Sequence, residues 1–241
     1  MPARKAGVEK VAVITGGGTG IGLATARLFA QSGYSVIITG RDAKRLKRAA
    51  DNIAKKNGQV AAIACDVRDP ASVNKLFSEI GKHHSSIDVL MNNAGVAHAL
   101  APVDQLPLKT WKEVIDTNLT GTFLVTQAAL PLMRAGGTIV NNLSVAALQP
   151  FAGMSAYNAS KFGALGFTHA LREDLRKRGI RVLALLPGAT DTEIWRQFWP
   201  DAPREKMISA ETVAQAVLHA VSAPANTTIE EIRIGPAAGV L

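Results

Sequence analysis

The sequence predicts an α/β fold in which a doubly wound parallel sheet of about seven strands carries helices on both faces. Short runs rich in β-branched residues alternate with helical stretches, and each parallel crossover requires such a connecting helix. No linker, repeat or low-complexity segment interrupts this alternation. With 241 residues, of which 47% are apolar and 19% are charged, the chain can bury one substantial core. We therefore expect residues 1–241 to form a single domain.

The predicted elements follow one another in a regular order. The first strand, KVAVIT at 10–15, runs into a glycine-rich turn and a helix over 22–33. After the second strand, Asp42 is well placed to cap a basic helix that extends to about residue 57. The strands expected after the first lie at 35–39, 59–65, 87–92, 137–143, 180–186 and 229–234. The remaining helices are expected near 70–83, 108–134, 153–178 and 210–222.

Composition argues against several classes of protein. No apolar run is long enough to span a membrane, and the basic start leads into a strand and a turn without a secretory apolar region. Cys65 is the only cysteine, which favours a buried structural thiol in a cytoplasmic protein. The net charge of +8 comes from short helical groups without a nucleic-acid-binding module, so we expect no nucleic acid partner and only a mild attraction for anionic ligands. The five histidines lack metal-ligand spacing, so we expect no metal.

A glycine-rich turn, TGGGTGIG at 15–22, directly follows the first strand and opens a helix. Its spacing, G-x-x-x-G-x-G, differs from the G-x-G-x-x-G dinucleotide fingerprint. Glycine nevertheless lets the backbone approach a ligand closely, and the free N–H groups of a helix N-terminus favour a phosphate. We predict that the turn binds the pyrophosphate of a dinucleotide through Gly16, Gly18, Thr19, Gly20 and Ile21.

The end of the second strand, TGRD at 39–42, indicates which dinucleotide binds. An acidic side chain there suits the ribose 2′-hydroxyl of NAD, whereas a cation suits the 2′-phosphate of NADP. Arg41 follows the strand-end glycine, and Asp42 is better placed as a helix cap. We therefore favour NADP(H), with Arg41 on the phosphate and Lys44 or Arg45 assisting it, and keep NAD(H) as the alternative.

The stretch SAYNASK at 155–161 lies in the long helix expected over 153–178. Tyr157 and Lys161 are four residues apart and therefore share one face of that helix. The ammonium is expected to lower the pKa of the phenol from about 10 toward neutrality, which would make Tyr157 a general acid/base. Ser144 follows an apolar run, so it is expected at the carboxyl end of a strand, where open parallel sheets bind ligands.

Together these motifs resemble the short-chain dehydrogenase/reductase family, over nearly the whole chain. Besides the glycine turn, the matching stretches occur in the order CDV at 65–67, NNAG at 92–95, Asn118 in DTNLTGTF, Ser144, YNASK at 157–161 and PGATDT at 187–192. The resemblance implies a Rossmann-like fold, in which Tyr157 exchanges a proton with the substrate oxygen and Ser144 polarises that oxygen. It also implies that Lys161 lowers the pKa of the tyrosine and binds the nicotinamide ribose. Asn118 would distort its helix and hold a water for proton relay.

The same resemblance implies the remaining cofactor contacts. Asp66 and Val67 would contact adenine, Asn93, Ala94 and Gly95 the adenosine ribose, and Pro187, Gly188, Thr190 and Thr192 the nicotinamide carboxamide.

The expected activity is that of an NADP(H)-dependent oxidoreductase that interconverts a carbonyl and a secondary alcohol by hydride transfer. Residues 191–207 resemble a substrate lid, which would close apolar bulk over a small, rather apolar substrate. The expected substrate contacts are His98, Phe151, Met154, Trp195 and Trp199. The resemblance also implies a homodimer or homotetramer formed through the two long helices.

Three alternatives belong to other classes. A serine hydrolase would place its nucleophile at Ser155, but GMSAY at 153–157 lacks the closing glycine of G-x-S-x-G. A sugar epimerase would ordinarily need a longer substrate domain. A non-catalytic NADP-binding regulator would have no need of Ser144, Tyr157 and Lys161 together.

Overall fold

Seven parallel strands form one sheet in the order β3-β2-β1-β4-β5-β6-β7. The computed structural model describes residues 9–56 and 58–239. Its strands are β1 (Lys10–Thr15), β2 (Tyr34–Gly40), β3 (Val60–Ala64), β4 (Ile87–Asn92), β5 (Met133–Asn142), β6 (Arg181–Pro187) and β7 (Glu231–Ile234). The predicted α/β class, with its doubly wound parallel sheet, is confirmed.

Helices connect the strands. They are α1 (Gly20–Gln31), α2 (Ala43–Ala54), α3 (Pro70–His83), α4 (Leu108–Ile115), α5 (Gly121–Ala129), α6 (Ser155–Arg176) and α7 (Ala210–Val221). Asp42 caps α2 as predicted, because its carboxylate accepts a hydrogen bond from the Arg45 N–H at 2.9 Å. Asp69 and Ser209 cap α3 and α7 in the same way. The predicted end of the second helix, near residue 57, lies outside the described residues.

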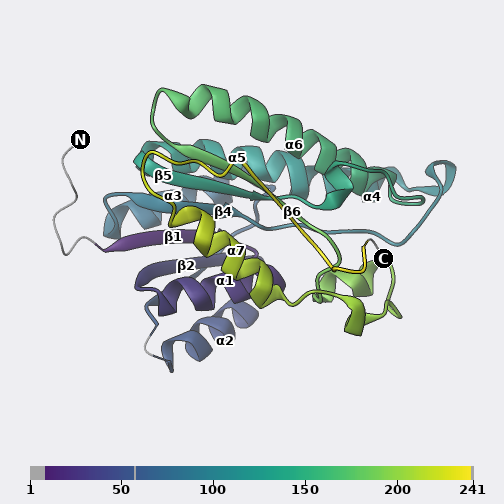
Figure 1. The fold of residues 1–241 in the computed structure, drawn as a ribbon, viewed down its shortest axis with the longest axis horizontal. Helices are drawn as coiled ribbons and strands as arrows, with labels where there is room; N and C mark the ends of the chain where they lie inside the picture. The colour runs from purple at the N-terminus through teal and green to yellow at the C-terminus, as the bar shows by residue number, and fades with distance from the viewer. Residues whose placement is uncertain (1–8, 57, 240–241) are drawn as a thin grey trace.

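Successive strand residues point to opposite faces of the sheet and build two separate cores. On one face Ile14 belongs to a buried cluster with Phe29 of α1 and Val217 of α7. On the other face Val13 belongs to a cluster with Leu76 of α3. Helices α1, α2 and α7 therefore cover one face and α3, α5 and α6 cover the other (Figure 1). The single cysteine, Cys65, is buried, and burial raises the pKa of its thiol.

The helix expected over 108–134 is wrong as one continuous element. A π-helical segment, Asp116–Thr120, separates α4 from α5, and a single 3₁₀ turn, Leu130–Leu132, follows α5. Pro131 ends the helical stretch because it has no N–H to donate. Strand β5 then begins at Met133, four residues before the expected start, with an irregular register against β4.

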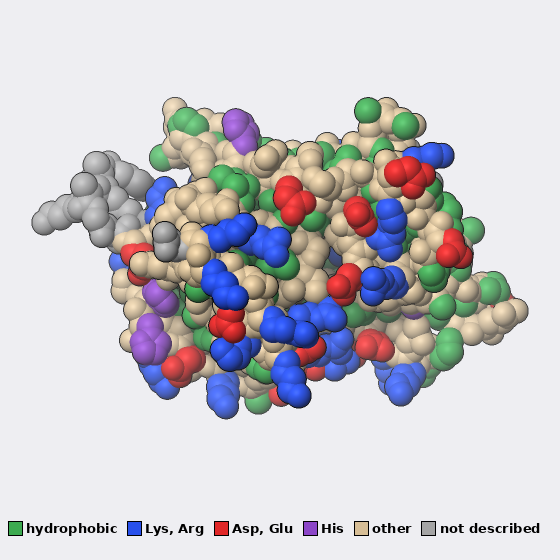
Figure 2. Space-filling model, turned by 90° about the horizontal axis from the view of Figure 1, so that it is seen from below, with side chains coloured by type: hydrophobic (Ala, Val, Ile, Leu, Met, Phe, Trp, Pro, Cys, Tyr) green, Lys and Arg blue, Asp and Glu red, His purple; other side chains and the backbone are tan. Residues whose placement is uncertain are grey.

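The strand order reverses between β1 and β4, which opens a crevice at the carboxyl ends of these strands. The basic residues of α2 lie exposed on the opposite side of the molecule from α6, and Lys47 pairs there with Asp51 at 3.2 Å. Figure 2 shows Lys and Arg side chains interspersed with Asp and Glu side chains on this face. Within residues 9–56 and 58–239, no helix is both long and apolar enough to cross a membrane.

Candidate active site

A cavity of about 720 Å³ opens at the carboxyl ends of the strands. It is bordered by the turn after β1, the segment after β5, the start of α6, the residues after β6 and the end of β7. The predicted site residues that line it are Gly16, Thr19, Gly20, Ile21, Asn93, Gly95, Ser144, Phe151, Met154, Tyr157, Lys161, Pro187, Gly188, Thr190, Thr192, Trp195 and Trp199. Those that do not line it are Gly18, Arg41, Asp66, Val67, Ala94, His98 and Asn118.

The glycine turn fits a pyrophosphate. Gly16 and Gly20 have positive φ angles of 65° and 51°, which glycine adopts without a steric penalty. A Cβ atom on Gly22 would lie 2.5 Å from the Gly16 carbonyl oxygen, so α1 can approach the turn only through a glycine. Thr19 is the N-cap of α1 but makes no side-chain capping bond, so its side chain does not occupy the first-turn N–H groups.

Tyr157, Ser144 and Lys161 converge on the wall formed by α6. Lys161 is only 6% exposed and donates a hydrogen bond to the Asn142 carbonyl oxygen at 3.0 Å. Its Nζ lies 5.5 Å from the centroid of the Tyr157 ring. Ser144 Oγ accepts a hydrogen bond from the Ala146 N–H at 3.1 Å, which leaves its hydroxyl hydrogen to be donated to Tyr157.

The structure contradicts the expectation that Lys161 brings the pKa of Tyr157 toward neutrality. Burial raises the pKa of Tyr157 to about 12, and its hydrogen bond with Ser144 lowers this value only in part. Burial also lowers the pKa of Lys161 to about 8. The same low-dielectric surroundings that disfavour the phenolate also disfavour the ammonium that was expected to stabilise it.

Asn118 lies in the π-helical segment between α4 and α5 and is 2% exposed. Its side chain exchanges two hydrogen bonds of 2.9 Å with the backbone of Val96 and donates a third to Ser160 at 3.0 Å. These bonds hold the segment after β4 against α6 at Ser160, which directly precedes Lys161 and lies three residues after Tyr157. The helix distortion expected at Asn118 therefore coincides with a contact that positions α6.

Charged side chains surround the end of β2. Arg41 is exposed and lies 3.9 Å from Glu113, and Arg45 pairs with Glu193 at 2.9 Å. The stem of Arg45 lies beside Gly18, 3.4 Å from the position of an added Cβ atom.

Asp66, at the predicted adenine site, forms a bidentate ion pair with Arg68. Arg68 donates from Nη2 to Oδ2 at 2.6 Å and from Nε to Oδ1 at 2.9 Å. The hydrogen bonds from Arg68 lower the pKa of Asp66.

The segment predicted as a lid, 191–207, is held by its own contacts. Trp195 donates from Nε1 to the Thr190 carbonyl oxygen at 2.8 Å, and its ring lies 4.9 Å from that of Phe198. Gln197 accepts a hydrogen bond from the Ala97 N–H at 2.8 Å, which connects the segment to the loop after β4. Trp195, Phe198 and Trp199 all line the cavity.

Comparison with known proteins agrees with the family that the motifs indicate and with the observed fold. The model of the short chain dehydrogenase family matches residues 10–203. The chain belongs to this family. The predicted family resemblance is thereby confirmed, and the protein is an oxidoreductase.

Two relatives in this family are each 35% identical to the chain. One is sulfoacetaldehyde reductase 2 of Chromohalobacter salexigens, aligned over 95% of both chains. The other is serine 3-dehydrogenase of Agrobacterium fabrum, aligned over 93% of this chain and 92% of the relative.

Solved structures share the fold. Serine dehydrogenase in its closed form, complexed with NADP+, is 29% identical with a TM-score of 0.87, covering 96% of each chain. An alcohol dehydrogenase from the archaeon Thermococcus sibiricus, complexed with 5-hydroxy-NADP, is 26% identical with a TM-score of 0.88, covering 96% of this chain and 98% of the neighbour.

In this short-chain dehydrogenase one wall of the cavity was not predicted from the sequence. Arg233, Ile234, Gly235, Pro236 and Gly239, at and after the end of β7, line it. The pairing of β7 with β6 brings this segment to the site. There Gly235 packs against Gly188, the residue that follows β6. His98, in contrast, is 5% exposed, lies outside the cavity and places Nδ1 2.8 Å from the Ala99 carbonyl oxygen.

Metal ligands are not grouped in the described part of the chain. Within residues 9–56 and 58–239, no three His, Cys, Asp or Glu side chains are arranged to hold an ion.

Proposed function

We propose that this short-chain dehydrogenase is an NADP(H)-dependent oxidoreductase that interconverts a carbonyl and a secondary alcohol. One observation carries the proposal: the Tyr157 phenol, the Ser144 hydroxyl and the Lys161 ammonium line the same cavity as the glycine turn. A regulator that only binds a nucleotide has no use for this set of proton-transfer groups.

The bound cofactor supplies the hydride, and the protein orients the substrate and provides the proton. Reduction of a carbonyl develops negative charge on its oxygen, which the Ser144 hydroxyl stabilises by donating a hydrogen bond. Tyr157 delivers the proton from its phenol oxygen, and its raised pKa keeps the phenol in the donor form at neutral pH. Lys161, fixed on the Asn142 carbonyl oxygen, would bind the nicotinamide ribose of the cofactor.

The choice of NADP(H) over NAD(H) rests on the end of β2. The Asp42 carboxylate is engaged by the backbone of α2 and is therefore poorly placed for a ribose 2′-hydroxyl. Arg41 stands exposed beside it, with a weak 3.9 Å contact to Glu113, and is available to a 2′-phosphate. Solved relatives complexed with NADP+ and 5-hydroxy-NADP support the same choice.

The substrate is proposed to be a small carbonyl compound or alcohol that lies under the lid, 191–207. Phe151, Met154, Trp195 and Trp199 supply apolar walls that exclude water from the reacting atoms. The names of the relatives, a sulfoacetaldehyde reductase and a serine 3-dehydrogenase, support a substrate of small size.

A panel of ketones, aldehydes, quinones and secondary alcohols, followed by NADPH or NADH absorbance, tests the proposal. Tyr157→Phe is expected to lower turnover by ~10² or more while leaving NADPH affinity nearly unchanged, because the phenol oxygen acts only on the reacting oxygen. Tyr34→Phe, which removes a phenol oxygen in β2 outside the cavity, is the control and is expected to keep wild-type turnover. Near-normal turnover of Tyr157→Phe would remove the tyrosine from the mechanism, and NADPH binding without turnover of any compound would favour a regulator.

We also propose that the protein acts in the cytoplasm as a homodimer or homotetramer. Trp111 of α4, Phe123 of α5 and Phe162 of α6 are 36%, 43% and 44% exposed, which favours an apolar contact between subunits. Light scattering after size-exclusion chromatography tests the oligomeric state, and a monomer would contradict the proposal.

A further inference from the structure

Arg233, the third residue of β7, brings a cation into the wall of the cavity. The charged side chains that line the cavity are Lys161, Glu193 and Arg233. Lys161 is buried against the Asn142 carbonyl oxygen, and Glu193 is neutralised by Arg45 at 2.9 Å. Arg233 therefore contributes a charge that the lining residues themselves do not balance.

The acidic residues near Arg233 are already paired. Glu230 lies 3.4 Å from Arg172, and Glu231 lies 2.9 Å from His169. Among residues 9–56 and 58–239, Arg233 itself forms no ion pair or hydrogen bond. Its guanidinium, with five donors, is thus available to a ligand in the cavity.

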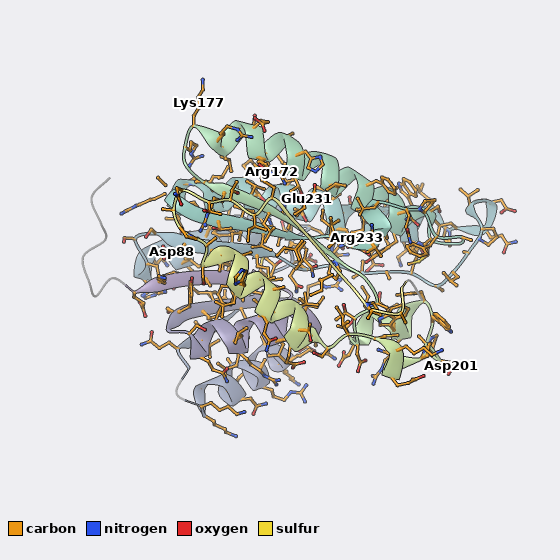
Figure 3. All side chains as sticks on the ribbon, in the orientation of Figure 1. Asp88, Arg172, Lys177, Asp201, Glu231 and Arg233 are labelled. Carbon is orange, nitrogen blue, oxygen red and sulfur yellow. The ribbon has the colours of Figure 1, made fainter. Side chains whose placement is uncertain are left out.

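The direction of Arg233 follows from the alternation of β7. Glu231 meets His169 of α6, so Arg233, two residues further on, lies on the same face as Glu231. Ile232 and Ile234 point to the other face, into the core that α1 and α7 cover. Figure 3 labels Glu231 and Arg233 along β7, and Arg233 lies nearer to the lid, which carries Asp201.

Arg233 is also separate from the predicted pyrophosphate site. It pairs in register with Leu186 at the end of β6, immediately before Pro187 and Gly188. The glycine turn borders the cavity from the end of β1, and β4 and β5 lie between β1 and β6 in the sheet. A ligand group at Arg233 therefore belongs with the substrate end of the cavity rather than with the phosphates.

We propose that Arg233 binds an anionic group of the substrate, so that the enzyme selects small carbonyl compounds or alcohols that carry a carboxylate or a similar oxyanion. This inference rests on the proposed function and adds the charge of the substrate to it. A guanidinium matches a carboxylate with two parallel hydrogen bonds, and the apolar walls of the cavity strengthen the attraction. The cavity then holds the reacting oxygen at Tyr157 and Ser144 and the anionic end at Arg233.

The test compares the binding of matched ligands by titration calorimetry in the presence of NADP+, which does not reduce a ketone. Acetoacetate, 4-oxopentanoate and 5-oxohexanoate are each titrated beside their uncharged methyl esters. The wild-type protein is expected to bind at least one keto acid about tenfold more tightly than its ester, a preference limited by the exposure of the guanidinium. Raising the salt concentration is expected to reduce this preference.

Three variants assign the preference to one side chain. Arg233→Gln is expected to bring each acid and its ester within twofold of one another, with unchanged NADPH affinity. Arg233→Lys is expected to retain part of the preference, because it keeps the charge without the planar fork. Arg27→Gln, which removes an exposed guanidinium of α1 outside the cavity, is expected to retain all of it.

Several results would overturn the inference. They are a wild-type protein without preference for any acid, binding of neither member of any pair, and an Arg233→Gln variant that keeps the preference. A loss of NADPH affinity in Arg233→Gln with the preference intact would instead assign the guanidinium to the cofactor. Absence of turnover with every compound of the panel of ketones, aldehydes, quinones and secondary alcohols would contradict the proposed function. The preference for the keto acids in the calorimetric titrations would not depend on that result.

Discussion

The buried ammonium of Lys161 makes the stability of this protein depend on pH, and Lys161→Met isolates the effect. Burial lowers the pKa of Lys161 from 10.5 to about 8. Below pH 8 the folded and unfolded chains both bind the proton, so its contribution to stability is constant. Between pH 8 and 10.5 the unfolded chain binds more protons than the folded chain, so the free energy of unfolding rises with pH.

The size of the effect follows from the two pKa values. Between pH 7 and pH 10 the wild-type protein is expected to gain about 2.5 kcal/mol relative to Lys161→Met. At pH 7 the buried charge costs roughly 3 kcal/mol, but the variant also leaves the Asn142 carbonyl oxygen without its donor, at ~1–3 kcal/mol. These two effects nearly cancel at pH 7, so the change with pH is the decisive quantity. The raised pKa of Tyr157 lowers stability only as the pH rises from about 10 to about 12, above this range.

Urea unfolding of both proteins at pH 7, 8, 9 and 10, without cofactor, measures the difference. Lys177→Met, which removes an exposed ammonium just after α6, is the control and is expected to show no such change. A difference between wild type and Lys161→Met that stays constant from pH 7 to pH 10 would refute a lowered pKa for the buried lysine.

Two further predictions concern the cofactor end of the cavity. Arg41→Ala is expected to raise the KM for NADPH about tenfold and to leave that for NADH unchanged, since only NADPH carries the 2′-phosphate; an equal change for both cofactors in steady-state kinetics would contradict the assignment. Gly22→Ala is expected to lower the free energy of unfolding by ~1–3 kcal/mol, because its Cβ atom would press on Asn93 and on the Gly16 carbonyl oxygen. Gly166→Ala of α6, where an added Cβ meets nothing within 4 Å, is its control and is expected to gain up to ~1 kcal/mol; equal behaviour of the two variants in urea unfolding would argue against a close approach at Gly22.

The sequence was informative wherever a local signal had a local cause. The run at 10–15 and the capping residue Asp42 predicted β1 and the start of α2, since burial of β-branched residues and a side-chain cap act within a few residues. The spacing of Tyr157 and Lys161 likewise placed both on one face of α6, and both line the cavity.

The features that the sequence did not predict depend on distant contacts. A helix distortion at Asn118 was expected, but its contacts were not: Asn118 bonds to the backbone of Val96 and the hydroxyl of Ser160, which lie far from it along the chain. Arg233 reaches the cavity only because β7 adds to the sheet beside β6. The pKa of Tyr157 was misjudged because helical spacing reports the neighbouring ammonium but not the burial that both groups share.

A chain of amide contacts explains why the glycine turn and Lys161 keep a fixed position relative to one another. Asn93 donates to the carbonyl oxygens of Thr15 at 2.9 Å and Gly16 at 3.2 Å, and so holds the turn after β1. The side-chain oxygen Oδ1 of Asn93 accepts a hydrogen bond from Asn142 Nδ2 at 2.8 Å, and the Asn142 backbone oxygen accepts the bond from Lys161 at 3.0 Å. Because these residues sit at the ends of three adjacent strands, the sheet itself sets the distance between the proposed pyrophosphate site and the proposed proton donor, as a preorganised site requires.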